Sequence, residues 1–308
     1  MIGDKTIYCL NSAAVGDLIA AAPSIKYAIE NFHKKADYFV GIHEHFKPLF
    51  PFVPENKFLE VKADYDKSFA VRHLNMLGVG GMNCKLTPSR MRLTEYASIG
   101  LLGRVLPEQQ LKYVSLPKVD TSHFGVDFSK AVVIMTTYRD KQRSIIPSEI
   151  VKIAEYVSAK GLTPVYAGKT GAISIWKNSL AKTDFDYPGF GVNLMDKTTL
   201  LELATIMGQS RAVIGMDSGP VHLAFTTDVP VVCGFTTVAP ELRIPYRGLA
   251  KTEAVVPDIF CNFCESNWSL NAWNFQKCPR QMELAECVTK MSSDKFIKAL
   301  NKLNIFTP

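Results

Sequence analysis

The chain has 308 residues, of which 47% are hydrophobic and 21% are charged. This composition is typical of a folded globular protein and excludes a disordered or fibrous chain. The unbroken apolar stretches, such as residues 18–23, are far shorter than the roughly 20 residues that span a bilayer. No continuous apolar segment of the signal-peptide kind opens the sequence. We therefore expect a cytoplasmic protein without a transmembrane segment, built from about two domains.

The charged residues leave a formal net charge of +6, with 35 Lys and Arg against 29 Asp and Glu. An excess of positive charge favours an anionic partner, such as a nucleotide, a nucleic acid or an anionic glycolipid. An ordinary solvated surface explains the same excess. The charge alone therefore leaves the partner open.

Apolar runs alternate with amphipathic stretches along most of the chain, which is typical of an α/β protein with parallel sheets. In the first half, strands are predicted at residues 6–11 and 37–42, with helices at 16–32 and 93–106. Pro23 is expected to kink the first helix or to start a second helical segment. Between these elements, residues 75–92 contain three glycines and a proline, which indicates a mobile loop.

Residues 113–130 are polar and proline-containing, which is typical of a linker between domains. The alternation then restarts. Further strands are predicted at 131–136, 163–167, 212–216 and 229–235, and further helices at 147–160, 173–181, 198–208 and 220–226. Two doubly wound halves result, and ligands of such folds bind beyond the carboxyl ends of the strands. We therefore expect the site in the cleft between the halves.

The segment AVIGMDSGPVHLAF, residues 212–225, contains the sharpest local signal. A strand leads into Asp217, Ser218 and Gly219, and a helix is predicted to start directly afterwards. Free N–H groups at a helix start bind anions, and His222 lies one turn further along. Alternatively, Asp217 or Ser218 only caps the helix and His222 is a core histidine.

Two other segments follow predicted strands in the same way. In the first, Gly16 and Asp17 stand at a helix start, where a carboxylate is either an N-cap or a catalytic base. In the second, TTYRDKQRS, hydroxyl and basic groups suited to a diphosphate come together. These groups are Thr136, Thr137, Arg139, Lys141 and Arg143. A merely solvated basic loop is the alternative.

Together these segments resemble the family 9 glycosyltransferases, which include the ADP-heptose:lipopolysaccharide heptosyltransferases. The strongest match is DSGPVHLA at residues 217–224, followed by Pro230 and two valines. The others are Gly16–Asp17 before Pro23, the two threonines with basic residues before Pro147, and LLELA at 200–204. The resemblance runs in order over about residues 5–290.

The resemblance implies a GT-B fold, in which two Rossmann-like domains face each other across a cleft. It implies an acceptor-side domain at 1–118, a linker at 119–130 and a donor domain at 131–292 with a Cys-rich loop at 261–287. The C-terminal helix, 293–308, is then expected to pack back on the N-terminal domain.

The resemblance also implies the chemistry: an inverting glycosyltransferase that requires no cofactor and takes a nucleotide-sugar as donor. Asp17 would be the general base, and the acceptor would be a saccharide of the lipopolysaccharide type. The implied donor residues are Thr136, Thr137, Lys141, Arg143, Asp217, Ser218, Gly219 and His222. The acceptor-side candidates are Gly16, Arg72, Arg90 and Arg92. Residues 67–107, part of the acceptor-side domain, match no known pattern.

Four cysteines lie close together in the sequence, at Cys261, Cys264, Cys278 and Cys287. The first pair has the spacing of zinc ligands, and four sulfurs would make a structural site because no coordination position stays open. Reduced thiols explain the cluster equally well. Disulfides are disfavoured in the expected cytoplasmic location.

Two other functions compete with the leading hypothesis. A glycosyltransferase of the bacteriophage type would act on a hydroxymethylated base in DNA, which the positive charge and the basic residues between Arg72 and Arg92 favour. A non-catalytic nucleotide-sugar-binding module would not need Asp17 as a base.

Overall fold

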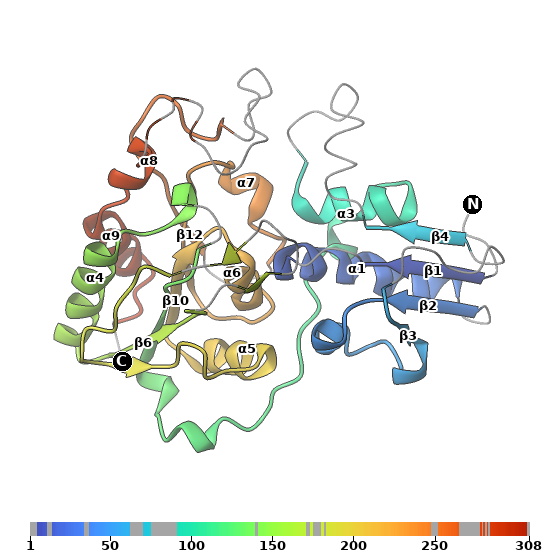
Figure 1. The fold of residues 1–308 in the computed structure, drawn as a ribbon, viewed down its shortest axis with the longest axis horizontal. Helices are drawn as coiled ribbons and strands as arrows, with labels where there is room; N and C mark the ends of the chain where they lie inside the picture. The colour runs from blue at the N-terminus through green and yellow to red at the C-terminus, as the bar shows by residue number, and fades with distance from the viewer. Residues whose placement is uncertain are drawn as a thin grey trace. The chain divides into compact units, whose positions relative to one another are not determined.

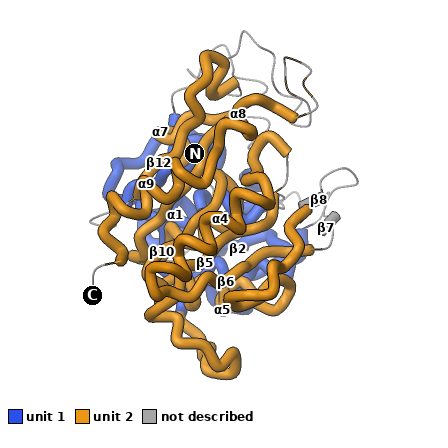
Figure 2. The backbone as a smooth tube through the Cα atoms, turned by 90° about the vertical axis from the view of Figure 1, so that its left-hand side faces the viewer, with its two compact units in different colours: residues 1–117, 244–247 blue, residues 118–243, 248–308 orange. Residues whose placement is uncertain are grey.

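The computed structural model describes residues 5–10, 14–33, 37–61, 70–74, 91–138, 141–170, 173–174, 180–181, 183–247, 252–264, 278, 280, 282 and 284–306. The chain forms two compact units. Unit 1 consists of residues 1–117 and 244–247, and unit 2 of residues 118–243 and 248–308 (Figure 2). A short piece from late in the sequence therefore belongs to the first unit.

Unit 1 is built on a parallel four-stranded sheet with strand order β3-β2-β1-β4. Its strands are β1 (Lys5–Cys9), β2 (Asp37–Gly41), β3 (Phe58–Leu59) and β4 (Ala70–His73). Helix α1 (Val15–Phe32) follows β1 and packs against α3 (Leu93–Leu102). Short 3₁₀ turns, η1 (Glu44–Leu49), η2 (Glu55–Lys57) and η3 (Glu108–Gln110), complete the unit.

Pro23 lies inside α1, and the helix continues through it as one element of 18 residues. A proline in a helix interior removes one backbone hydrogen bond and usually bends or ends the helix. Here the surrounding residues 18–25 are all buried, so packing compensates for the lost bond. The alternative of a second helix starting at Pro23 is therefore wrong.

Unit 2 contains a parallel six-stranded sheet with strand order β12-β11-β10-β5-β6-β9. The strands are β5 (Ala131–Met135), β6 (Thr163–Ala167), β9 (Val192–Asn193), β10 (Ala212–Met216), β11 (Val231–Gly234) and β12 (Thr252–Val255). Every residue of β5, β10 and β11 is buried. Central strands of a parallel sheet are covered on both faces, which is why these segments are continuously apolar.

The helices of unit 2 are α4 (Pro147–Ala159), α5 (Leu200–Gln209), α6 (Gly219–Ala224), α7 (Pro240–Arg243), α8 (Glu286–Thr289) and α9 (Ser293–Lys302). Figure 1 shows α4 and α9 together on one side of the sheet and α5 on the other. The 3₁₀ turns are η4 (Ser122–Phe124), η5 (Phe128–Lys130) and η6 (Lys141–Arg143). The predicted α/β class with parallel sheets is confirmed.

The helix predicted at residues 173–181 is wrong. Two short strands, β7 (Ile173–Ser174) and β8 (Leu180–Ala181), pair there as an antiparallel ladder. Spacing of apolar residues cannot separate helix from strand in so short a segment. Pairing between β7 and β8, which local spacing does not reveal, determines the secondary structure here.

The C-terminal helix α9 belongs to unit 2. Phe296 and Leu300 of α9 are part of the core that α4 and the sheet form. The guanidinium of Arg211 donates two hydrogen bonds to the carbonyl of Ile305, at 3.1 and 2.9 Å. The apolar face of this amphipathic helix therefore has its partner within unit 2.

Among the described helices, none is both long enough and apolar enough to cross a membrane.

Candidate functional site

Asp217 is the centre of a charged cluster at the carboxyl end of β10. Its carboxylate lies 3.1 Å from Nη2 of Arg143 and 3.5 Å from Nε of Arg243. Nε2 of His222 lies 3.6 Å from its other oxygen. Arg143 also donates from Nε to the backbone carbonyl of Asp217 at 2.9 Å. Residues from η6, α6 and α7 thus meet at one side chain.

This cluster carries more positive than negative charge. Burial by itself would raise the pKa of Asp217, but Arg143, Arg243 and His222 outweigh it and hold that pKa well below its usual range. The carboxylate is therefore ionised, and it neutralises only one of the two guanidinium groups. The arginine side chains are 18% and 22% exposed, whereas that of Asp217 is 5% exposed. The arginines, rather than Asp217, can thus reach a ligand, and guanidinium groups suit phosphate oxygens.

Ser218 follows Asp217 and occupies the N-cap position of α6. Its hydroxyl makes no capping bond, and its Oγ is buried without a hydrogen-bond partner among the described residues. The alternative that the Ser218 side chain caps the helix is therefore wrong. An unsatisfied buried hydroxyl is costly unless a ligand or water pairs with it. Gly219 begins the helix, and His222 is buried against Asp217.

The two threonines after β5 use their hydroxyls within the protein. Thr136 Oγ1 donates to the carbonyl of Ala167 at 3.3 Å. Thr137 Oγ1 donates to the carbonyl of Lys169 and accepts from its N–H, at 3.2 and 2.6 Å. These bonds join the end of β5 to the end of β6. The hydroxyls of Thr136 and Thr137 are thus already hydrogen-bonded within the protein, where they join the ends of β5 and β6.

The structure separates the basic candidates. Arg143 reaches Asp217, whereas Lys141 is exposed on the same short turn. Arg139 lies outside the described residues. The sequence analysis did not identify Arg243 as a site residue. The one feature that could have indicated it is its position in the short helix α7 that follows β11.

In unit 1, Asp17 lies in the first turn of α1, directly after the loop that follows β1. Ala14 is the N-cap, so the alternative that Asp17 caps the helix is wrong. A carboxylate in the first turn is favoured by the helix dipole. Asp17 is half-buried, and the adjacent Gly16 is buried.

The acceptor-side arginines have different surroundings. Arg92 donates to the carbonyl of Ile244 and its guanidinium lies 4.4 Å from the centre of the Tyr246 ring. Arg72 lies in β4 and is close enough to Tyr8 to oppose the effect of burial, which raises the pKa of that phenol. Arg90 is outside the described residues. The guanidinium of Arg92 thus makes its hydrogen bond and its aromatic contact within unit 1.

The four clustered cysteines are half-buried, and none of them is in a disulfide. Burial, followed by the nearby thiols of the other three, raises the pKa of Cys287 to about 11. The other three thiols thus lie near enough to Cys287 to affect its pKa. Within the described part of the chain, however, no three metal-binding side chains are already arranged around one point.

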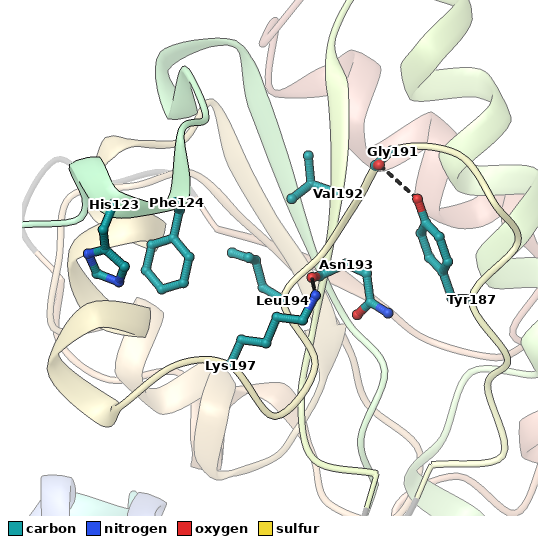
Figure 3. Close-up of a pocket in the computed structure, with 8 residues that line it drawn as sticks. All are labelled: His123, Phe124, Tyr187, Gly191, Val192, Asn193, Leu194 and Lys197. Carbon is teal, nitrogen blue, oxygen red and sulfur yellow. Dashed lines mark hydrogen bonds between the residues drawn. The ribbon is translucent and has the colours of Figure 1, made fainter.

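A separate open pocket of about 580 Å³ lies beside the edge strand β9 (Figure 3). Tyr187 donates to the carbonyl of Gly191 at 3.0 Å, and Nζ of Lys197 donates to that of Asn193 at 2.9 Å. These bonds cover the edge of the sheet. The lining contains none of the predicted site residues: His123, Phe124, Tyr187, Gly191, Val192, Asn193, Leu194 and Lys197.

We expect Asp217→Asn to destabilise the protein by about 3–5 kcal/mol, because it leaves two partly buried guanidinium groups without their anion. The lowered pKa of Asp217 stabilises the fold above the unfolded-state pKa of about 4, and this contribution is lost as the pH falls. The difference between wild type and variant should thus shrink below about pH 4. Urea unfolding over a pH series measures it, with the exposed Asp258→Asn as control. A difference that stays constant with pH would contradict this account.

Comparison with known proteins agrees with the sequence analysis. Residues 176–257 match the model of glycosyltransferase family 9 (heptosyltransferase). The matched region contains Asp217, Ser218, His222, Thr236 and Arg243. The search of curated proteins gives no match.

Several solved structures share the fold. TibC, an iron-containing dodecameric glycosyltransferase from enterotoxigenic E. coli H10407, superposes with a TM-score of 0.71 at 17% identity, covering 97% of this chain and 76% of that one. A family 9 glycosyl transferase from Veillonella parvula DSM 2008 gives 0.61 at 14% identity, covering 98% of each chain. The E. coli ADP-heptose lipopolysaccharide heptosyltransferase II gives 0.56 at 12% identity, covering 97% and 98%.

The resemblance found in the sequence and the fold predicted from it are both confirmed. The family match covers β10, α6, β11 and α7, and so contains Asp217, His222 and Arg243 of the cluster but not Arg143. The chain therefore has the GT-B fold of these glycosyltransferases, and its residues 176–257 are similar to glycosyltransferase family 9 (heptosyltransferase).

Proposed function

We propose that unit 2 binds a nucleoside-diphosphate sugar through Arg143, Arg243 and Ser218, and that the sugar passes to an acceptor hydroxyl. The observation that carries this proposal is the Asp217 cluster. One buried carboxylate holds two partly exposed guanidinium groups, beside a buried hydroxyl that has no partner in the described structure. Such a site suits the oxygens of a diphosphate.

Proteins of the same fold support the proposed donor and acceptor classes. TibC has been seen in complex with ADP-D-beta-D-heptose, and E. coli heptosyltransferase WaaC with ADP. The E. coli heptosyltransferase II acts with ADP-heptose on lipopolysaccharide. These relatives support an ADP-sugar as donor and a saccharide of the lipopolysaccharide type as acceptor.

The proposed reaction is a single displacement that inverts the anomeric carbon and needs no metal ion. The acceptor oxygen attacks the anomeric carbon while its proton passes to the carboxylate of Asp17. The bond to the diphosphate breaks, and its electron pair leaves with the nucleoside diphosphate. The guanidinium groups of Arg143 and Arg243 then stabilise the negative charge that develops on the leaving group.

Of the two alternatives, the DNA acceptor lacks a supporting observation. Arg92, one of the basic residues that motivated it, is bound by Ile244 and Tyr246 of its own unit. A non-catalytic binding module predicts that Asp17 is dispensable, so the Asp17 variant below tests it.

We expect Arg243→Gln to weaken the binding of the preferred nucleotide at least about tenfold, because one charge-assisted contact to the diphosphate is lost. Calorimetry with ADP, UDP and GDP measures the affinities, and the exposed Lys130→Gln is the control. If the wild type binds none of the three, or if the variant binds as tightly as the wild type, the donor site is wrongly assigned.

We expect Asp17→Asn to lower kcat by about 10²-fold or more and to leave the nucleotide affinity unchanged, because only the proton acceptor is removed. Release of the nucleoside diphosphate in the presence of a core oligosaccharide measures the rate. The exposed Asp37→Asn in the same unit should behave as wild type. An unchanged kcat would favour the non-catalytic module.

We further propose that the four clustered cysteines hold one structural metal ion. Four cysteine thiols form a donor set that suits zinc or iron, and TibC, which shares the fold, contains iron. When bound, the ion would cross-link the segment between Cys261 and Cys287.

Elemental analysis of the purified protein should find about one zinc or iron per chain, and Cys264→Ser should lose most of it. The buried Cys233, outside the cluster, provides the control variant Cys233→Ala. A wild-type protein with neither metal would favour reduced thiols.

A further inference from the structure

The Cys-rich segment is tied to the turn that carries Arg143 through Thr236. This threonine follows β11 and is 3% exposed. Its hydroxyl donates to the carbonyl of Gln142 at 2.6 Å, and Gln142 is the residue before Arg143 in η6. A short, partly buried hydrogen bond restrains the backbone of Gln142, directly before Arg143.

The carbonyl of the same Thr236 accepts a hydrogen bond from the N–H of Phe263 at 2.8 Å. Phe263 lies between Cys261 and Cys264 and has a positive φ of 59°, which is uncommon for a bulky side chain. The neighbouring Asn262 donates to the carbonyl of Pro257 at 2.7 Å. Thr236 thus bonds both Phe263, between the first two clustered cysteines, and Gln142 of the Arg143 turn.

The other end of the segment reaches the same turn. Helix α8, which contains Cys287, packs against η6. Arg280 lies 3.8 Å from Sγ of Cys261 and donates to Glu286 of α8 at 2.7 Å. Arg280 therefore links Cys261 to α8, which contacts η6 directly, while Phe263 reaches η6 through Thr236.

Arg143 depends on an accurate position of this turn. It bonds the backbone carbonyl of Asp217 at 2.9 Å and the carboxylate at 3.1 Å. Hydrogen bonds weaken steeply with misalignment, and a displacement of about 1 Å in a site residue can be enough to impair its function.

We propose that Thr236 is a positioning residue that transmits the order of the turn between Cys261 and Cys264 to Arg143. Through it, the state of the cysteines controls the affinity of the donor site for a diphosphate. The effect on affinity rests on the proposed function, whereas the effect on the order of η6 does not.

The chain offers a matched control in the next residue. Thr237 is also buried, at 5% exposed, but its hydroxyl has no hydrogen-bond partner in the described part of the structure. Thr→Val at either position removes a hydroxyl and keeps the shape of the side chain. Only at Thr236 does the change leave a carbonyl, that of Gln142, without its donor.

The first experiment is hydrogen–deuterium exchange of the peptide that covers residues 141–146, together with calorimetric titration of ADP. Thr236→Val should speed exchange at 141–143 and weaken ADP binding about five- to tenfold. Thr237→Val should match the wild type, and Thr236→Ser, which retains the hydroxyl, should restore both values. Unchanged exchange in Thr236→Val would overturn the proposal.

The second experiment combines Thr236→Val with Cys264→Ser, with Cys278→Ser as the substitute if Cys264→Ser fails to fold. The cysteine change should speed exchange at 141–143 in the wild type and have a much smaller effect in Thr236→Val, because coupled changes are not additive. Additive effects would overturn the coupling. If the wild type binds no nucleotide while the exchange data behave as expected, the proposed function fails and Thr236 still orders the turn.

Discussion

The buried carboxylate of Asp217 is the constraint on which unit 2 depends. A carboxylate cannot be buried without charged or hydrogen-bonding partners. Its partners come from three different places in the chain: Arg143 from η6, His222 from α6 and Arg243 from α7. The loops after β5, β10 and β11 are therefore held at one point, at the carboxyl edge of the sheet, where doubly wound folds bind their ligands.

The polar groups around this point divide into those that build the site and those that can meet a ligand. Thr136, Thr137 and His222 are occupied by the protein itself, while the two arginines keep part of their surface exposed. Thr236 bonds both Phe263, which lies between Cys261 and Cys264, and Gln142, which precedes Arg143. The turn at Cys261–Cys264 and the Asp217 cluster are therefore linked through one residue.

The sequence by itself determined the α/β class, most strands of the sheets and the family resemblance, because continuous apolar strands and DSGPVHLA are local patterns. It also placed Asp17 at a helix start and Asp217 and Ser218 directly after a β-strand, where the structure has them. Only the tertiary structure decided which basic residues reach Asp217. Arg243 is far from Asp217 in sequence, and parallel pairing of β10 with β11 brings the two together. Tertiary packing likewise placed α9 in the core of unit 2 and paired β7 with β8. The local sequence of an apolar face or a short strand does not show which segment will pack or pair with it.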